Sequence, residues 1–353
     1  MGKHIAVIGA GAVGGYVGAF LTEAGSRVSF IDPWPEHIDH IKRHGITVRS
    51  ADTETTIAAR ALHIHEVQTL TWDPIDIALV AVKSFDTAWA TALIAGYLSP
   101  AGYAVSMQNG MNEQQLADVV GWDRVLGCIV SGLGVKCTDP GQIYRFLAPP
   151  TGSDHAVFRI GEIGGACTMR ATELAAMLGA VDRAIVTPNL WGERWTKLIT
   201  NSFTHGVLGA SGQWDEDFYR DEDWGHRVLK AVFAESISVG RSLGYEIGSV
   251  CGAAPDVWLA AYDGQEQAEL EIREAMKAWC EFKVKEPSRS SVGRDISQGR
   301  RSEIEFTTGL VARKAREIGL PAPIHARLTE MVLELQAGRI DASPERIHEL
   351  PIR

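Results

Sequence analysis

The stretch His4-Ile-Ala-Val-Ile-Gly-Ala-Gly-Ala-Val-Gly14 decides the fold of the N-terminal half. A short apolar run, typical of a buried strand, leads into glycines that fit the pattern G-x-G-x-x-G, and a helical pattern follows. Glycines at this spacing allow a tight turn, close approach of a pyrophosphate to the backbone, and close packing of helix on strand. We therefore expect a dinucleotide to be held by Gly9, Gly11, Ala12, Val13 and Gly14. The alternative is a glycine-rich turn that binds no dinucleotide.

Asp32 follows a second apolar run, Val28-Ser-Phe-Ile31. In folds of this kind an acid at the end of the second strand binds the adenosine ribose hydroxyls and repels a 2′-phosphate. This favours NAD as the cofactor, with NADP as the alternative. Both the role of Asp32 and the cofactor choice stay open. Asp32 also suits a turn before Pro33, and basic side chains nearby are able to reach a 2′-phosphate: Arg27, Lys42 and Arg43.

Short strands and helices alternate through the first half of the chain. The patterns predict a helix to about Glu23 and others over 35–42, 86–98 and 169–178, with strands over 77–82, 103–107 and 184–186. Antiparallel strands are expected over 142–147 and 156–160. Continuous apolar strands alternating with helices are typical of a parallel, doubly wound α/β sheet with helices on both faces.

The second half of the chain is almost wholly helical in pattern. Pro188-Asn189 marks a boundary, because proline ends the preceding run and asparagine is suited to cap a helix. We predict a dinucleotide-binding domain over 1–187, an all-helical domain over 188–338, and a loosely held tail over 339–353.

Composition excludes several classes of protein. The chain has 353 residues and a net charge of −10, which disfavours nucleic acid and anionic membranes as partners. It shows neither a spanning apolar run nor a signal-peptide cleavage site, and its five cysteines form no Cys-x-x-Cys pair, so we expect a cytoplasmic protein. We expect no metal site, because His63-Ile-His65 alternates as on a strand and lacks a third ligand.

Lys197, Asn201 and His205 are spaced four residues apart in a predicted helix, so they share one face. Their helix also carries Trp195, Leu198 and Ile199. A polar stripe of this composition indicates a functional site, although a stripe without chemistry remains the alternative.

Five separate motifs, in this order along residues 4–335, resemble the ketopantoate reductase family. They are the glycine motif, Val82-Lys83, Gln108-Asn109-Gly110-Met111, Trp195-Thr-Lys197 with Asn201, and the segment from Ser290 through Glu303. The resemblance implies an N-terminal Rossmann domain, an all-helical C-terminal domain and an active site between them. It also implies hydride transfer between a nicotinamide and the carbonyl of a 2-oxo acid.

The same resemblance assigns roles to single residues. Lys197 would protonate the nascent alkoxide, and Glu303 would hold and tune Lys197 and reach the cofactor. Asn109 would lie near the nicotinamide ribose and Lys197. The cofactor would be contacted by Lys83, and the substrate would be bound by Asn201, Ser291 and His205. The chemistry is consistent, because a positioned ammonium stabilises and then neutralises negative charge that develops on oxygen.

Three features depart from the family pattern. His205 stands where a second Asn is usual, Asp32 suits NAD, and extra sequence occupies about 251–287, including a predicted acidic helix over 265–279. They predict an NAD-preferring enzyme that acts on a 2-oxo or 2-hydroxy acid other than ketopantoate. The alternatives are an NADPH-dependent 2-dehydropantoate 2-reductase of pantothenate biosynthesis and a non-catalytic dinucleotide sensor. The family resemblance implies that the helical domain over 188–338 binds substrate and forms a homodimer.

Overall fold

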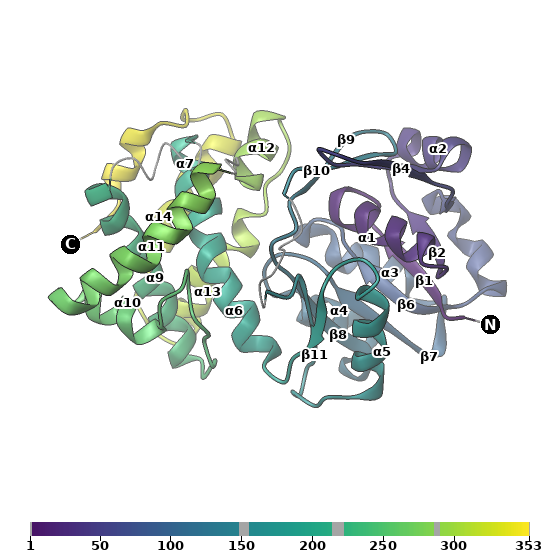
Figure 1. The fold of residues 1–353 in the computed structure, drawn as a ribbon, viewed down its shortest axis with the longest axis horizontal. Coiled ribbons are helices and arrows are strands. Elements are labelled where there is room, and N and C mark those ends of the chain that lie inside the picture. The colour runs from purple at the N-terminus through teal and green to yellow at the C-terminus, as the bar shows by residue number, and fades with distance from the viewer. Residues whose placement is uncertain (1, 148–154, 214–221, 286–289, 353) are drawn as a thin grey trace. The chain divides into compact units, whose positions relative to one another are not determined.

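Two units divide the chain in the computed structural model, Met1–Leu190 and Trp191–Arg353. The structure describes residues 2–147, 155–213, 222–285 and 290–352 (Figure 1). Unit 1 contains the predicted sheet, and unit 2 is helical.

The central sheet of unit 1 has eight strands, all parallel to their neighbours except where β8 and β11 pair antiparallel. In spatial order these strands are β12 (Ala184–Val186), β11 (Phe158–Glu162), β8 (Val125–Val130), β7 (Leu98–Ser106), β6 (Ile75–Val80), β1 (His4–Ile8), β2 (Arg27–Ile31) and β5 (Arg60–Leu62). After β1, the chain adds β2 and β5 on one side of β1, and it then crosses to the other side of β1, where β6 and the later strands lie. This order creates a topological switch point between β1 and β6, where open α/β sheets bind their ligands.

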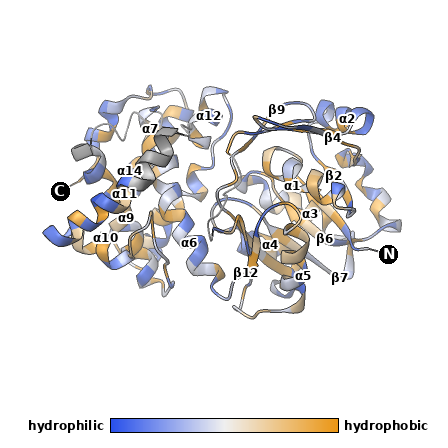
Figure 2. Ribbon diagram, viewed as in Figure 1, coloured by the Kyte–Doolittle hydropathy of each residue, from blue (hydrophilic) through white to orange (hydrophobic). Residues whose placement is uncertain are grey.

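Both faces of the sheet are buried. Ile5 and Val7 of β1 pack into one apolar cluster, whereas Ala6 and Ile8 pack into a second cluster on the opposite face. This alternation explains why the strands read as continuous apolar runs rather than as alternating ones. Figure 2 shows that the central strands are mostly hydrophobic, whereas helix α2 is mostly hydrophilic. The helices of unit 1 are α1 (Ala12–Glu23), α2 (Pro35–His44), α3 (Thr87–Ala95), α4 (Glu113–Val120) and α5 (Met169–Leu178).

A smaller four-stranded sheet completes unit 1. Its strands, in spatial order, are β4 (Glu54–Ile57), β3 (Ile46–Arg49), β10 (Gln142–Arg145) and β9 (Val135–Asp139). Helix α1 contacts strands of both sheets. Glycine makes this close packing possible, because a Cβ on Gly18 would lie 2.4 Å from the Phe30 ring and one on Gly15 would lie 2.9 Å from Ile143 Cδ1. The sequence did not predict β3, β4 or β9.

Two local predictions in unit 1 were wrong. The helix expected over 86–98 ends at Ala95, because Leu98 already pairs with Ile75 as the first residue of β7. His63 and His65 do not lie on a strand. His63 is the N-cap of the 3₁₀-helix η1 (Ile64–Trp72), and it forms a capping box with Glu66 at the start of that helix. The other short 3₁₀-helices of unit 1 are η2 (Ser84–Asp86) and η3 (Trp122–Arg124).

Unit 2 consists of helices. They are α6 (Leu190–Asn201), the π-helical turn η4 (Ser202–Val207), α7 (Leu208–Ser211), α9 (Glu222–Ser242), α10 (Pro255–Tyr262), α11 (Glu266–Lys285), α12 (Ser291–Ser297), η5 (Ile304–Phe306), α13 (Thr308–Glu317), α14 (Pro323–Gln336) and η6 (Pro344–Glu349). The helix expected over 265–279 corresponds to α11. Among the described residues, no helix is long and apolar enough to cross a membrane.

The segment 339–353 is not a loosely held tail over its described residues, which end at 352. Ile347 and Leu350 are buried, and the backbone N–H of Ser343 donates to the Ala210 carbonyl oxygen at 3.3 Å. Arg327 on α14 forms an ion pair with Glu349 at 2.6 Å. The prolines indicated an irregular segment, but two apolar side chains anchor it to unit 2 by burial.

Candidate functional site

The glycine motif lies at the carboxyl end of β1, at the switch point of the sheet. Gly9 has a φ of +95°, and a Cβ there would lie 2.6 Å from the backbone nitrogen of Val82. Only glycine adopts this backbone conformation at so close an approach without strain. Gly11 is the N-cap of α1, and a Cβ on it would meet nothing within 4 Å. The start of α1 therefore presents backbone N–H groups beside open space, an arrangement suited to a phosphate.

Asp32 lies at the carboxyl end of β2 and contacts the glycine loop. The backbone N–H of Ala10 donates to Asp32 Oδ2 at 2.8 Å, and the N–H of Trp34 donates to Oδ1 at 2.9 Å. Burial raises the pKa of the Asp32 carboxyl above its usual value, and these backbone hydrogen bonds oppose that rise. Because each carboxylate oxygen has two acceptor positions, both retain capacity for a ribose hydroxyl.

The three basic side chains that the sequence left as phosphate contacts are all paired with acids. Arg27, at the amino end of β2, lies 2.7 Å from Asp73. Lys42 Nζ lies 2.5 Å from Glu66, and Arg43 lies 3.2 Å from Asp39. Strand β2 separates Arg27 from Asp32 by several residues, each advancing about 3.3 Å. The geometry therefore argues against Arg27 as a phosphate ligand beside Asp32.

His37, which the sequence did not single out, ties the glycine loop to the small sheet. Its Nε2 lies 2.9 Å from the Ala10 carbonyl oxygen, and the backbone N–H of Gly141 donates to its Nδ1 at 2.9 Å. The carbonyl only accepts and the N–H only donates, so the buried ring is neutral with its proton on Nε2. The indole of Trp34 stacks on it, with ring centroids 5.2 Å apart. No sequence signal joins His37 to Gly141, which lies far along the chain.

Lys83 and Asn109 follow adjacent parallel strands, β6 and β7, so the same edge of the sheet carries both. Hydrogen bonds join their loops, because Gln108 Nε2 donates to the Val82 carbonyl at 2.9 Å and Ser84 Oγ donates to the Asn109 carbonyl at 3.1 Å. All cofactor residues predicted within unit 1 thus lie at the carboxyl edge of β1, β2, β6 and β7.

In unit 2, the helix that carries the polar stripe changes its winding. Lys197 and Asn201 lie in α6, both half-buried and four residues apart on one face. His205 lies in η4, where the chain adopts π-helical turns. The expectation of one regular helix from Lys197 to His205 was wrong, because wider π turns rotate His205 relative to α-helical spacing. Such turns are rare and often occur at functional sites.

His205 and Ser291 are brought together. Ser291 is the first residue of α12, and its Oγ lies 3.1 Å from Nε2 of the buried His205. Glu303 is buried before η5, and its carbonyl oxygen accepts a hydrogen bond from Thr307 Oγ1 at 3.2 Å. The pairing of Glu303 with Lys197 stays a prediction.

One further cluster in unit 2 resembles a catalytic arrangement. Ser236, His325 and Glu235 are linked in the order of a hydrolase triad, with Ser236 Oγ 2.7 Å from His325 Nε2 and Glu235 Oε1 2.6 Å from Nδ1. Ser236 and His325 are fully buried, and Glu235 also accepts backbone N–H groups at the start of α14. This cluster therefore anchors the start of α14, and its Ser236 side chain is not exposed to solvent.

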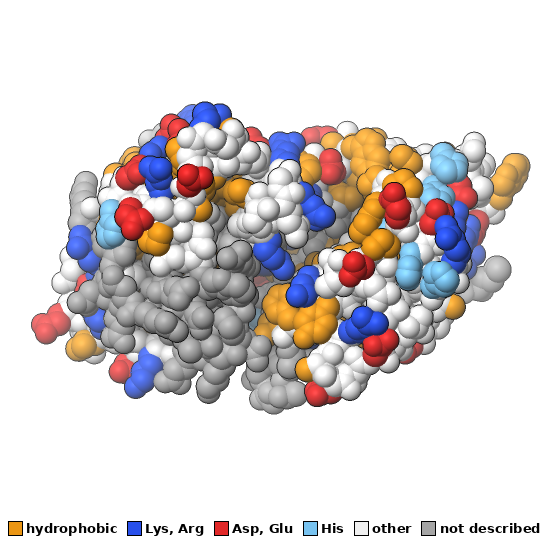
Figure 3. Space-filling view, turned by 90° about the horizontal axis from the view of Figure 1, so that it is seen from above, with side chains coloured by type: hydrophobic (Ala, Val, Ile, Leu, Met, Phe, Trp, Pro, Cys, Tyr) orange, Lys and Arg blue, Asp and Glu red, His pale blue; other side chains and the backbone are white. Residues whose placement is uncertain are grey.

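Histidine side chains gather on one side of unit 1 in the space-filling view (Figure 3). The rings of His40 and His44 lie 5.0 Å apart, and those of His63 and His65 stack at 5.3 Å. Within the described part of the chain, no group of three or more His, Cys, Asp or Glu side chains could hold a metal ion.

Models of one protein family match both units. The model for ketopantoate reductase PanE/ApbA matches residues 5–151, and the model for its C-terminal part matches residues 189–336. These matches cover well over half of the chain, so it belongs to the ketopantoate reductase family, and the resemblance seen in the motifs is confirmed. The family consists of NAD(P)-dependent oxidoreductases that act on CH–OH or carbonyl groups.

Individual relatives are distant but extend over nearly the whole chain. The 2-dehydropantoate 2-reductase of Archaeoglobus fulgidus is 24% identical over 342 residues, covering 95% of this chain and 99% of the relative. A ketopantoate reductase structure from Ralstonia eutropha has 23% identity and a TM-score of 0.75, covering 96% and 99% of the two chains. D-mandelate dehydrogenase with NADH and anilino(oxo)acetate has 20% identity and a TM-score of 0.78, with the same coverage. These structures confirm the predicted Rossmann domain followed by a helical domain.

Proposed function

We propose that this protein is an NAD-linked oxidoreductase that interconverts a 2-oxo acid and the corresponding 2-hydroxy acid, with a substrate other than 2-dehydropantoate. The observation that carries the cofactor choice is Asp32, held at the glycine loop by the Ala10 and Trp34 N–H groups. A carboxylate there accepts ribose hydroxyls and repels a 2′-phosphate. The ion pairs of Arg27, Lys42 and Arg43 support the same preference.

The residues at the carboxyl edge of the sheet fit a dinucleotide. Gly11 leaves open space at the start of α1, where a pyrophosphate would receive N–H groups from the first turn. Lys83 and Asn109 would contact the cofactor from the neighbouring loops. When bound, the nicotinamide would supply or accept the hydride at the substrate carbon.

Residues of unit 2 would handle the substrate. Lys197 would donate a proton to the carbonyl oxygen during reduction and take it back during oxidation. Glu303 would position Lys197 and keep its ammonium charged. Asn201, Ser291 and His205 would bind the substrate, with the hydroxyl of Ser291 oriented by His205 at 3.1 Å.

An NADPH-dependent 2-dehydropantoate 2-reductase is the second candidate. Curated relatives with that name align over most of this chain, among them those of Archaeoglobus fulgidus and Halobacterium salinarum, each 24% identical. Against it stand Asp32 and His205, which depart from the family motifs. A dinucleotide sensor without catalysis is less well supported, because the polar residues of unit 2 are present. The homodimer stays a prediction.

Equilibrium titration of the purified protein with NADH and NADPH tests the cofactor part of this proposal. We expect NADH to bind at least about tenfold more tightly, a difference of about 1.4 kcal/mol. Replacing Asp32 with asparagine removes the charge that opposes a 2′-phosphate. Asp32→Asn should therefore reduce the difference between the NADH and NADPH affinities. Asp118→Asn is the matched control, because Asp118 is an exposed acid of α4 that accepts a hydrogen bond from Gln114 and is not among the proposed cofactor residues. Tighter NADPH binding by the unmodified protein would contradict the proposal.

A further inference from the structure

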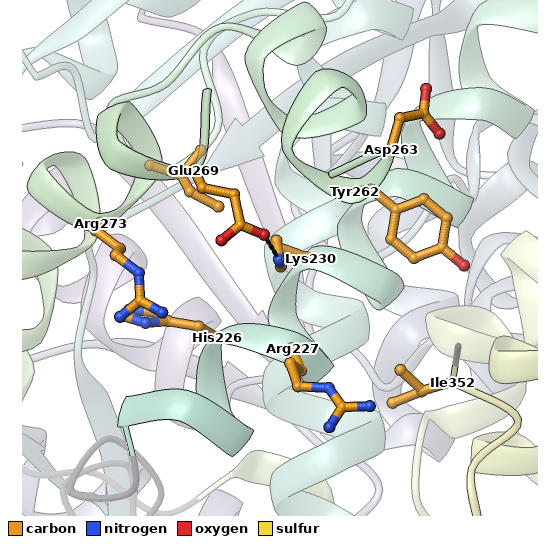
Figure 4. A pocket seen from close by; sticks show the side chains of 9 residues that line it. His226, Arg227, Lys230, Tyr262, Asp263, Glu269, Arg273 and Ile352 are labelled. Atoms are coloured by element: carbon orange, nitrogen blue, oxygen red, sulfur yellow. Dashed lines mark hydrogen bonds and ion pairs between the residues drawn. The ribbon is translucent and has the colours of Figure 1, made fainter. Parts of the chain in front are cut away.

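A cavity of about 690 Å³ lies within unit 2, lined by side chains of α9, α10 and α11 and by Ile352 (Figure 4). Its lysine and arginine side chains already have partners in the protein. Lys230 and Glu269 form an ion pair across α9 and α11, as the dashed line in Figure 4 shows, and Arg227 and Arg273 also interact with other groups. A charged ligand would have to displace these partners. An exposed aromatic ring at the glycine loop of unit 1 meets no such obstacle.

That ring belongs to Trp34, two residues after Asp32, where the chain leaves β2 and begins α2. The Asp32 carboxylate that receives the Trp34 N–H at 2.9 Å also receives the N–H of Ala10 in the glycine loop at 2.8 Å. Trp34 is 40% exposed, whereas tryptophan is highly buried on average. An exposed indole thus lies beside the acid proposed to bind the adenosine ribose.

The ring and the backbone of Trp34 are both held in place. The indole stacks on the His37 ring, with the centroids 5.2 Å apart and the planes inclined by 7°. His37 is buried, and its two nitrogens contact the Ala10 carbonyl and the Gly141 N–H. The Trp34 carbonyl accepts the N–H of Ile38 at 3.2 Å in the first turn of α2. An indole fixed in this way loses little conformational freedom when a second ring stacks on it.

The chemistry of a nucleoside connects Asp32 with this indole. The base and the 2′-hydroxyl are attached to adjacent carbons of the ribose, so a ribose bound through its hydroxyls to Asp32 carries its base close to Trp34. The indole lies on the glycine-loop side of α2, because the His37 ring beneath it contacts Ala10. Purines are flat aromatic rings that stack on aromatic side chains. The exposed part of the indole therefore suits a purine base.

We propose that Trp34 is the stacking platform for the adenine base of the dinucleotide, and that His37 is the positioning residue that holds the indole. This inference rests on the proposed cofactor site and adds to it the contact for the base. A stack recognises the flat surface of the base and not the 2′-position of the ribose. Trp34 therefore contributes to the binding of NADH and NADPH alike, whereas Asp32 discriminates between them.

Calorimetric titration of the full-length protein with ADP-ribose tests this inference, because ADP-ribose contains the adenosine and the pyrophosphate but lacks the nicotinamide. We expect Trp34→Ala to weaken ADP-ribose binding about tenfold, within the range for removal of one stacked ring. Trp34→Phe keeps an aromatic ring and should bind within about threefold of the unmodified protein. Trp72→Ala is the matched control, because Trp72 is an exposed tryptophan at the end of η1, shortly before the amino end of β6.

Tryptophan fluorescence tests the stack itself, because a purine stacked on an indole quenches the indole emission. ADP-ribose should quench part of the emission of the unmodified protein and of Trp72→Ala. Trp34→Phe should bind ADP-ribose without this quenching. The second measurement does not require Trp34→Ala to fold normally, and thermal unfolding of each unliganded variant shows whether its fold is intact.

The possible contrary results separate this inference from the proposed function. Unchanged affinity in folded Trp34→Ala, or quenching retained in Trp34→Phe, would exclude the stack and leave the proposed cofactor site standing. Equal weakening by Trp72→Ala would indicate a general effect of removing a surface tryptophan and would also overturn the inference. Failure of the unmodified protein to bind either ADP-ribose or NADH would contradict the proposed function, and the stack with it.

Discussion

Replacing Lys197 with alanine is expected to lower kcat about 100- to 10,000-fold, the range for loss of a general acid. Hydride transfer to a carbonyl builds negative charge on oxygen, and Lys197 is the proposed group that stabilises and protonates it. The NADH dissociation constant should change little, because the cofactor residues proposed in unit 1 remain. Single-turnover reduction and NADH titration of the same variant separate the two effects.

Two further variants sharpen this test. Lys197→Arg keeps the positive charge but replaces the donor with a group that does not give up its proton near neutral pH, so it should also remain slow. Lys314→Ala removes a partly exposed lysine of α13 that pairs with Glu317, and it should retain normal turnover. Full turnover by Lys197→Ala, with cofactor still bound, would exclude Lys197 as the proton donor.

Replacing Gly14 with alanine should destabilise the protein by about 3 kcal/mol, at the upper end of typical overpacking costs. The new Cβ would lie 2.0 Å from the Gly9 carbonyl oxygen and 2.9 Å from Val7 Cγ1. The backbone of the loop must shift to relieve the first contact, since no flexible side chain is involved. Urea unfolding of the two proteins measures the difference in free energy.

Gly11→Ala is the matched comparison, because it adds the same methyl group three residues earlier. A Cβ on Gly11 meets nothing within 4 Å, so the free energy of unfolding should change by less than about 1 kcal/mol. NADH binding should nevertheless weaken at least about tenfold, because the methyl group occupies the space where a pyrophosphate approaches the backbone. Unaltered NADH affinity in Gly11→Ala would show that the cofactor does not bind at this loop.

Local patterns predicted the parts of unit 1 that depend on local interactions. The run ending at Ile8, the glycines after it and the alternation of apolar strands with helices were enough to predict the parallel sheet. The binding of a cofactor at its carboxyl edge stays a prediction. The contacts of Asp32 were beyond prediction, because they depend on where the backbone of Ala10 lies. His37 was missed for a similar reason, since its partner Gly141 is separated from it by a long stretch of chain.

In unit 2, the sequence predicted the helices better than their details. Spacing correctly placed Lys197 and Asn201 on one helix, but the π-helical turn that carries His205 has no local signature that distinguishes it from α-helix. The contact between His205 and Ser291 joins segments far apart in the chain and depends on how α12 packs. The anchoring of 339–352 depended on Ile347 and Leu350, two apolar residues within a polar stretch.

The most direct test of the proposed function is steady-state reduction of a panel of 2-oxo acids, including 2-dehydropantoate and acids with branched or aromatic side chains, with NADH and with NADPH. We predict the highest kcat/KM for NADH with an acid other than 2-dehydropantoate, with no turnover above background in Lys197→Ala. The highest kcat/KM for NADPH with 2-dehydropantoate would contradict this account and identify the protein as a biosynthetic ketopantoate reductase.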